Sequence, residues 1–484
     1  MKAYSKNGKK RAIQTSERKS TESTRYFCAA VQMDDKFCDQ VLEYTLEEDY
    51  KVIAICHDVD LPCVIRSCLS TKERRRERDI PLVVLTIIAF IAFFSFIPLS
   101  FIFYIIAWGI VFFDQKRIRY NILGQHLQRN NFDPDFFDLS LNQKTAKKLE
   151  EIEETQKANV IIYDGFSPFV GSGLNMGGWS LSIDVTKGKN DVGCIVEPLS
   201  FEISELYDYI SDSISELELD NLQITDSLHI NGQDLRGYKE ILPSPLMRPI
   251  TKLENDFVSR FVENPTHSIR HYRCIRVTDW KGELILSIFL RFARIGKNLF
   301  IEADYYLLAP VSAHYRRVDS FKSEPSFEDM LKLAIETSSS TFKYCLASIF
   351  FGINSIKSAF PLLSDSRRKR RKKIKEIKSN PAFNYGVYRS YREIISSSNE
   401  YNRYFQKLDK EMYLKTIERK IVDTLSQFLD IKNIDASDFK ETKSTILNNG
   451  VIVSGGNVST QNLTVGKNPT SIINTVTDKS DSKK

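Results

Sequence analysis

The 484-residue chain lacks the short motifs that identify several common classes of enzyme. It has no HExxH zinc-protease motif, no P-loop for nucleotide phosphates and no GxSxG nucleophile elbow. Histidine is scarce, and His229, His267, His271 and His314 fall in or beside one β-rich region. His267 and His271 follow Pro265 and lead into a strand, so a helical metal site is not expected. We therefore predict no catalytic residue, no metal and no cofactor.

Cysteine is also infrequent, with eight residues, and no two of them form a CxxC pair. Structural zinc sites normally contain such short, repeated spacings. Cys56, His57, Cys63 and Cys68 are close together in the sequence, but their spacing does not fit a zinc site. We interpret these cysteines as semi-buried thiols.

Charged residues are absent from the whole of the apolar run at residues 80–113. A single helix over this run would be about 51 Å long, whereas the hydrocarbon core of a bilayer is about 30 Å thick. Pro98 lies near the middle of the run and would interrupt the helical hydrogen bonds. The run therefore predicts a transmembrane hairpin of two short helices, at residues 80–96 and 99–113.

Basic residues border the apolar run on both sides: Lys72, Arg74, Arg75, Arg76 and Arg78 before it, and Lys116, Arg117 and Arg119 after it. Because positively charged loops stay on the cytoplasmic side, both ends of the hairpin are expected to face the cytoplasm. We therefore predict a location in the bacterial inner membrane, with cytoplasmic N- and C-terminal parts. The alternative is a hairpin buried in a protein core, which would need a long apolar pair without a polar face.

Changes in composition along the chain predict seven segments. These are a disordered basic N-terminus (1–24), a small α/β unit with a strand at 51–56 (25–79), the transmembrane hairpin (80–113), juxtamembrane and spacer helices (114–157), a β-rich cytoplasmic domain (158–320), a helical region (321–435) and a Gly/Asn/Ser-rich β tail (436–484). The predicted fold class is an α+β membrane protein with a transmembrane helical hairpin, an antiparallel β-rich cytoplasmic domain, C-terminal helices and a Gly/Asn-rich β tail.

Alternating apolar residues predict a three-strand meander at residues 271–278, 283–294 and 299–308. Such alternation is typical of an antiparallel sheet with one buried face and one wetter face. Glu302 and Asp304 share a face of the third strand. They either form a carboxylate pair suited to acid–base chemistry or simply face the solvent.

A glycine-rich loop follows a predicted strand at residues 159–163. Its glycine spacing is similar to that of a dinucleotide-binding loop, but such a loop needs a helix directly after the glycines. Residues 179–185 (WSLSIDV) alternate like a strand, so a β-hairpin or bulged loop is the better interpretation. We predict that this region binds a ligand or partner through Phe166, Gly171, Gly173, Gly177 and Trp179.

The segment at residues 366–378 (SRRKRRKKIKEIK) is strongly basic. Each basic residue near an anionic membrane leaflet contributes about 1 kcal/mol to binding. We predict that the segment binds anionic lipids of the phospholipid bilayer; nucleic acid is not favoured, and a merely solvated surface stays open. The predicted lipid-binding residues are Arg367, Arg368, Lys369, Arg370, Arg371, Lys372 and Lys373.

Apolar residues at helical spacing predict a long amphipathic helix at residues 401–428, and the Gly/Asn-rich tail follows it. Together these segments indicate a homo-oligomer, or a protein partner that binds the C-terminal tail.

Four stretches of the chain are similar to a known group of proteins: RYFCAA, YDGFSPFVGSG, HYRCIRVTDW and LRFARIGKNLFIEADYYLLAP. They resemble an uncharacterised family of bacterial, actinobacterial-type integral membrane proteins. This resemblance covers residues 25–320 and implies two membrane segments and a β-rich cytoplasmic domain, but no known activity. The tail sequence GVIVSGGNVSTQNLTVG is similar to β segments that end some bacterial conflict-system proteins.

These patterns favour a membrane-anchored protein whose cytoplasmic domain binds a ligand or partner. We expect it to act as a sensor or as a membrane-disrupting effector in antiphage defence. Two alternatives stay open. One is a membrane-tethered enzyme with a site in the glycine loop, which the missing catalytic motifs make less favoured. The other is an oligomerising scaffold.

Overall fold

The computed structural model describes residues 21–95, 97–137, 141–191, 194–359, 365–396 and 401–449. The chain divides into two units, each assembled from separate parts of the sequence. The first unit takes its described residues from Met1–Asp49, Cys56–Gln156 and Val311–Pro381. The second takes them from Tyr50–Ile55, Lys157–Pro310 and Ala382–Lys484.

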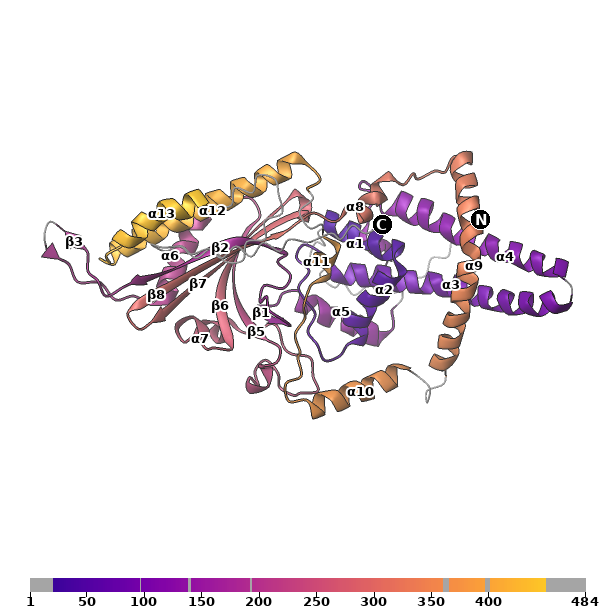
Figure 1. Cartoon of the computed structure of the whole chain (residues 1–484), viewed down its shortest axis with the longest axis horizontal. Helices are drawn as coiled ribbons and strands as arrows, with labels where there is room; N and C mark the ends of the chain where they lie inside the picture. Colours follow the sequence, from indigo (N-terminus) through magenta and orange to yellow (C-terminus); the bar gives the residue numbers. More distant parts are fainter. Residues whose placement is uncertain are drawn as a thin grey trace, which may run out of the picture. The chain divides into compact units, whose positions relative to one another are not determined.

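The first unit is helical (Figure 1). Its helices are α1 (Glu22–Met33), α2 (Asp35–Leu42), α3 (Leu61–Ser95), α4 (Ile97–Lys116), α5 (Gln143–Thr155), α8 (Ala313–Arg316), α9 (Phe327–Ala359) and α10 (Asp365–Ser379). Asp34 separates α1 from α2 because its carboxylate accepts hydrogen bonds from the first backbone N–H groups of α2. Leu82, Ala107 and Val111 form a buried cluster that joins α3 to α4, with Tyr344 of α9 packed against it.

The predicted transmembrane hairpin at residues 80–113 is wrong. Within the described part of the chain, no helix is long and apolar enough to cross a membrane. The prediction of an inner-membrane location depended on that hairpin, and the same finding overturns it.

The apolar run is part of two helices of the first unit, and only one side of it is packed against other helices. Its first part continues a helix that began at Leu61 and already contains charged residues, with Pro81 accommodated inside α3. Its second part, α4, lies against α9: the Trp108 indole donates to the Ala334 carbonyl at 3.2 Å and to the Thr337 hydroxyl at 3.1 Å. Only some residues of the run serve such contacts: Ala107 and Val111 are buried, whereas Phe90, Phe101 and Phe113 are each more than half exposed.

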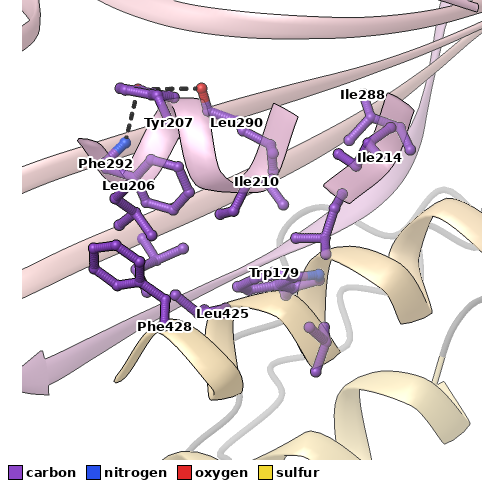
Figure 2. Packing of buried hydrophobic residues seen from close by; sticks show 14 of the residues in the cluster. Trp179, Leu206, Tyr207, Ile210, Ile214, Ile288, Leu290, Phe292, Leu425 and Phe428 are labelled. Atoms are coloured by element: carbon purple, nitrogen blue, oxygen red, sulfur yellow. Dashed lines mark hydrogen bonds between the residues drawn. The ribbon is translucent and has the colours of Figure 1, made fainter. Parts of the chain in front are cut away.

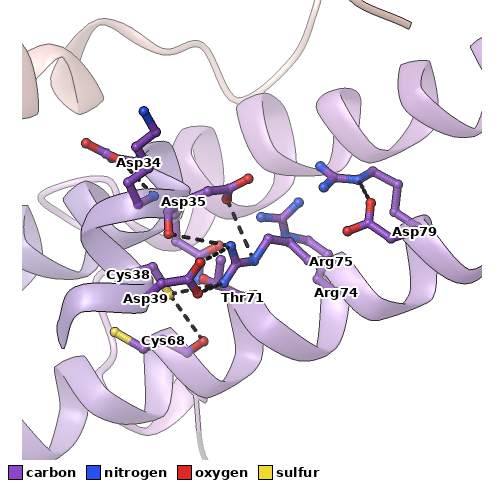
Figure 3. A network of polar contacts seen from close by, with 12 residues as sticks. Asp34, Asp35, Cys38, Asp39, Cys68, Thr71, Arg74, Arg75 and Asp79 are labelled. Atoms are coloured by element: carbon purple, nitrogen blue, oxygen red, sulfur yellow. Dashed lines mark hydrogen bonds and ion pairs between the residues drawn. The ribbon is translucent and has the colours of Figure 1, made fainter. Parts of the chain in front are cut away.

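Several of the basic residues before the run are used in intramolecular ion pairs (Figure 3). Arg74 pairs with Asp114 at 2.7 Å, and Arg78 contacts the same carboxylate at 3.2 Å. Arg75 pairs with Asp39. The side chains of Arg74, Arg78 and Asp114 are all buried, and buried charges are tolerated only when they are paired. A positive flank of a membrane segment and one half of an ion-pair network look alike in sequence.

The second unit is built around a six-stranded sheet in the order β1-β5-β6-β7-β8-β2. Its strands are β1 (Val160–Tyr163), β2 (Leu174–Asp184), β5 (Leu222–Asn231), β6 (Ile269–Asp279), β7 (Leu284–Ile295) and β8 (Asn298–Leu308). The predicted meander is confirmed, because β6, β7 and β8 are consecutive antiparallel neighbours. The sheet as a whole is mixed, since β1 pairs with β5 in parallel. A short ribbon of β3 (Asn190–Asp191) and β4 (Cys194–Ile195) forms separately.

Helices cover one face of this sheet. They are α6 (Ile203–Ser215), α12 (Tyr404–Ile431) and α13 (Ser437–Asn449), and they enclose the largest hydrophobic cluster of the protein's described part. Figure 2 shows Ile288, Leu290 and Phe292 of β7 pointing into it. Their spacing of two residues places them on a common face of the strand. The unit is completed by α7 (Asn255–Glu263) and α11 (Tyr391–Ile395).

Other predicted elements have mixed outcomes. The long amphipathic helix is confirmed as α12. The strand predicted at 51–56 is wrong, because this segment is irregular and contributes a backbone hydrogen bond of 3.0 Å from Val52 to Tyr385. The predicted β tail is wrong over its first part, where α13 is helical. Residues 1–20 and 450–484, which include the rest of that tail, lie outside the described residues.

Candidate functional site

A cleft of about 800 Å³ lies on the sheet face opposite the helices of the large cluster. Its floor is formed by residues of β2, β7 and β8, and its wall by the segment that joins α7 to β6. Alternation along β8 explains the contrast between the two faces. Ile301, Ala303 and Tyr305 are buried in the large cluster, so Glu302 and Asp304 face the cleft.

Strand register arranges the polar side chains in rows across the sheet. In one row, Glu302 pairs with Ser180 of β2 on one side and Arg291 of β7 on the other. In the next row, Asp304 lies between Gly178 and Phe289. The two carboxylates therefore occupy neighbouring positions on one strand, where each affects the charge of the other.

Glu302 is held by two donors. The Arg291 guanidinium contacts one carboxylate oxygen at 3.3 Å, and the Tyr272 hydroxyl donates to the other at 3.3 Å. Burial, the negative charge of Glu302 and a hydrogen bond with Glu302 raise the pKa of Asp304 to about 7. Asp304 is thus partly protonated near neutral pH, which gives the cleft both a hydrogen-bond donor and acceptors.

Glycines open the cleft above Asp304. At Gly177 the register of β2 shifts by a bulge, and this residue has a φ of 106°, which favours glycine. A side chain at Gly178 would meet the Ala303 carbonyl oxygen at 2.3 Å and the Asp304 carboxylate at 3.1 Å. Only a residue without Cβ leaves Asp304 accessible at this position.

Two basic residues lie on the other side of the cleft. His267 and Arg270 are exposed and precede or begin β6. Among the residues that the structure describes, no carboxylate forms an ion pair with Arg270. Arg294 also borders the cleft, but its guanidinium lies over the Phe201 ring at 4.8 Å.

The predicted glycine-region residues are only partly brought together. Gly177 and Trp179 border the cleft. The Trp179 indole, however, points into the large cluster (Figure 2) and donates to the Tyr305 hydroxyl at 2.6 Å. Phe166, Gly171 and Gly173 are not among the residues that line the cleft, and Phe166 is 97% exposed.

Gly171 and Gly173 instead bind a carboxylate of the same chain. Their backbone N–H groups donate to one oxygen of Glu393 in α11, at 3.0 and 2.9 Å. The other oxygen accepts from the Ser390 N–H at 2.7 Å, which completes a capping box at the start of the helix. The glycine loop is therefore fastened to α11.

The buried histidines serve other contacts. His271 faces away from the cleft and pairs with Asp226 at 2.9 Å, beside Arg273. His229 forms a hydrogen bond with Ser227, with 3.0 Å between its Nε2 and the serine Oγ. Burial lowers the pKa of His229 to about 4. Over the described ranges, no group of three or more histidine, cysteine or acidic side chains is arranged to hold a metal ion.

The predicted lipid-binding residues lie in α10, in the first unit. Arg368, Arg371 and Lys372 are exposed, whereas Lys369 pairs with Glu43 at 3.1 Å and Arg370 approaches Asp49 at 3.9 Å. Lys373 pairs with Glu376 at 3.5 Å. The side chain of Arg367 lies outside the described residues. Lipid binding by this helix stays a prediction.

Sequence reasoning noticed Glu302 and Asp304 but missed Arg270, Tyr272 and Arg291. A signal for them was present, because Arg270 and Tyr272 share a face of β6, and Arg291 falls opposite Glu302 once the turn between β7 and β8 is fixed. Pairing the strands of the predicted meander would have collected these side chains on one face.

Comparison with known families finds one match: a model described as an AbeC-like domain covers residues 178–460. The match begins within β2 and includes β5 to β8 and α12, so it contains most of the cleft. Searches of the curated proteins and of the solved structures found no match. None of these findings supports the resemblance to actinobacterial membrane proteins.

Proposed function

The chain belongs to the AbeC-like family, and from this premise we propose that it is an antiphage defence protein of the abortive-infection type whose AbeC-like domain binds a small polar ligand. In this proposal the cleft is the binding site and the domain acts as a sensor. The AbeC-like domain supports the antiphage defence role, and the cleft supports the ligand-binding role.

The observation that carries the proposal is the contrast between the two faces of the sheet. One face is covered by α6, α12 and α13, whereas the other has an open cleft of about 800 Å³. Small-molecule sites are typically concave, of this size range, and provided with a few converging polar groups. Glu302, Asp304, Arg291 and Arg270 are such groups, and Asp304 has the shifted pKa that often accompanies a binding site.

A plaque assay on bacteria that express the full chain tests the proposal. Ser180→Tyr would narrow the cleft beside Glu302 without changing its charge, because Ser180 lines the cleft there. Ser182→Tyr is the matched control, since Ser182 is exposed on the same face of β2 but does not line the cleft. We expect the wild type and Ser182→Tyr to reduce plaquing, and Ser180→Tyr to restore it by about 100-fold or more. Protection by a folded Ser180→Tyr variant would refute the proposal.

An enzyme with its site in the same cleft is the second candidate. It is favoured by one observation, the pKa of about 7 for Asp304 beside Glu302, because a general acid needs a pKa near the working pH. Mass spectrometry of nucleotides and sugars incubated with the purified protein separates the two candidates. New products that disappear with Asp304→Asn would favour the enzyme, and unchanged compounds would favour the sensor.

A further inference from the structure

We infer that the cleft takes a phosphorylated ligand of nucleotide size, with its phosphate at Arg270 and a hydrogen-bonding edge at Glu302 and Asp304. This inference rests on the proposed function and names the ligand class for the same cleft. The charge balance of the cleft, the protonation of Asp304 and the apolar residues of the cleft all support this ligand class.

The charge balance of the cleft favours an anion. Arg291 is neutralised by Glu302, which it contacts at 3.3 Å. Arg270 lines the same cleft and has no ion-pair partner among the described carboxylates. Its planar guanidinium presents paired N–H donors, a geometry that matches phosphate oxygens. With the imidazole of His267 beside it on the same wall, Arg270 is the natural position for a phosphate group.

Proton sharing explains how a phosphate can approach two carboxylates. The groups that face Asp304 are Glu302, the backbone at Gly178 and Phe289, while Arg291 and Tyr272 face Glu302. Because the pKa of Asp304 is about 7, Asp304 is partly protonated near neutral pH and the net charge of the two carboxylates lies between one and two negative charges. The neighbouring Arg291 offsets one of these charges. The protonated carboxyl can donate while Glu302 accepts, which suits the mixed donor and acceptor edge of a nucleobase.

The remaining lining is suited to a flat, partly apolar group. Ala293, Ile295, Phe300 and Pro265 contribute apolar surface next to the polar groups. Phe300 lies two residues before Glu302, on the same face of β8, with the Arg291 guanidinium carbon 6.0 Å from its ring centroid. Aromatic rings and guanidinium planes both stack against bases. Inorganic phosphate alone would leave most of the roughly 800 Å³ unfilled.

Calorimetry with the full chain at pH 6.5 tests the inference. The probes are the four ribonucleoside 5′-monophosphates, the corresponding nucleosides, ribose 5-phosphate and inorganic phosphate. We expect at least one nucleotide to bind, ribose 5-phosphate and phosphate to bind at least tenfold more weakly, and the nucleosides not to bind measurably. If ribose 5-phosphate binds as tightly as the best nucleotide, the ligand class is a sugar phosphate and the base contact is refuted.

Arg270→Gln is expected to weaken nucleotide binding at least tenfold. Arg260→Gln, which removes an exposed arginine of α7 outside the cleft, is the matched control and should bind as the wild type does. Arg270 is exposed, so its replacement leaves the core intact, and the thermal unfolding of each variant is compared with that of the wild type. Equal binding by Arg270→Gln and the wild type, or no binding by any phosphorylated probe, overturns the inference.

The plaque assay distinguishes this failure from failure of the proposed function. If no phosphorylated probe binds but Ser180→Tyr still abolishes protection, the cleft is functional and only the ligand class is wrong. If Ser180→Tyr protects as well as the wild type, the sensor proposal itself fails.

Discussion

At the scale of single residues, Glu393 decides the role of the glycine loop. The carboxylate accepts hydrogen bonds from Gly171, Gly173 and Ser390, and burial raises its pKa. Anion-binding glycines are often interpreted as a ligand site, and here the anion comes from α11. Nothing in the local sequence reveals this, because Glu393 lies more than two hundred residues away along the chain.

Removal of this carboxylate should destabilise the second unit. Glu393→Ala would leave three partly or fully buried N–H groups without their acceptor, and we expect a loss of about 2–3 kcal/mol in the free energy of unfolding. Urea denaturation measures this free energy of unfolding. Glu240→Ala, at an exposed glutamate of the same unit, is the control. A loss below about 0.5 kcal/mol would show that the hydrogen bonds of Glu393 contribute little to stability.

Asp304 should make stability depend on pH. Its pKa is about 7 in the folded protein and near the ordinary value of 3.8 in the unfolded chain. Between these values the folded state binds a proton that the unfolded state has released, so stability falls as the pH rises from 4 to 7. This contribution is fully present below pH 4 and lost above pH 7.

Asp304→Asn should remove that pH dependence. The amide has no charge to bury, so we expect the variant to be more stable than the wild type at pH 8, by about 1–2 kcal/mol, and similar to it at pH 4. Urea denaturation at both pH values is the measurement, with Asp256→Asn at an exposed position of α7 as the control. A wild type that is equally stable at both pH values would contradict the assignment of the shared proton.

At the scale of elements, α10 combines paired and unpaired cations. Arg371 and Lys372 are exposed, and replacing both with Gln should weaken binding to anionic vesicles by about 2 kcal/mol, or roughly thirtyfold. Co-sedimentation with vesicles containing phosphatidylserine measures this, with neutral vesicles for comparison. Lys144/Lys147→Gln, an equal change of charge on the exposed side of α5, is the control. Equal sedimentation of the two variants would rule out lipid binding by α10.

The elements also show which patterns could be predicted from sequence. The period of two in β6, β7 and β8 predicted the meander because a sheet with one covered face imposes it directly. The apolar run was misinterpreted because its composition alone does not reveal which of its residues pack against other helices, as Ala107 and Val111 do, and which stay exposed, as Phe90 and Phe101 do. Long-range partners decided the outcome: Thr337 and Ala334 bind Trp108, and Asp114 binds Arg74 and Arg78. The grouping of the cleft residues likewise depends on strand register, which the sequence does not give directly.

At the scale of the whole molecule, the second unit depends on distant parts of the chain. Leu414, Ile417, Ile421, Leu425 and Phe428 of α12 fill the cluster that covers the sheet. A fragment of residues 157–310 should therefore remain unfolded or aggregate, because it would expose that apolar face to water. The same fragment joined by a flexible linker to residues 382–449 should unfold cooperatively.

Circular dichroism during urea denaturation distinguishes the two fragments. A variant of the joined fragment with Leu425→Ala should lose about 2–5 kcal/mol, because a fully buried leucine is removed from the cluster. Cooperative unfolding of residues 157–310 alone would show that α12 is not required for the sheet to form.

The late position of α12 has a consequence for synthesis of the protein. When a ribosome has finished β8 at Leu308, the helix that covers the sheet is still to be made, and it ends only at Ile431. At roughly 10 residues per second, the apolar face of the nascent sheet stays uncovered for about 10 s before α12 has been made. During that interval the emerging chain is a natural client for chaperones, and the second unit cannot be complete until α12 has been made.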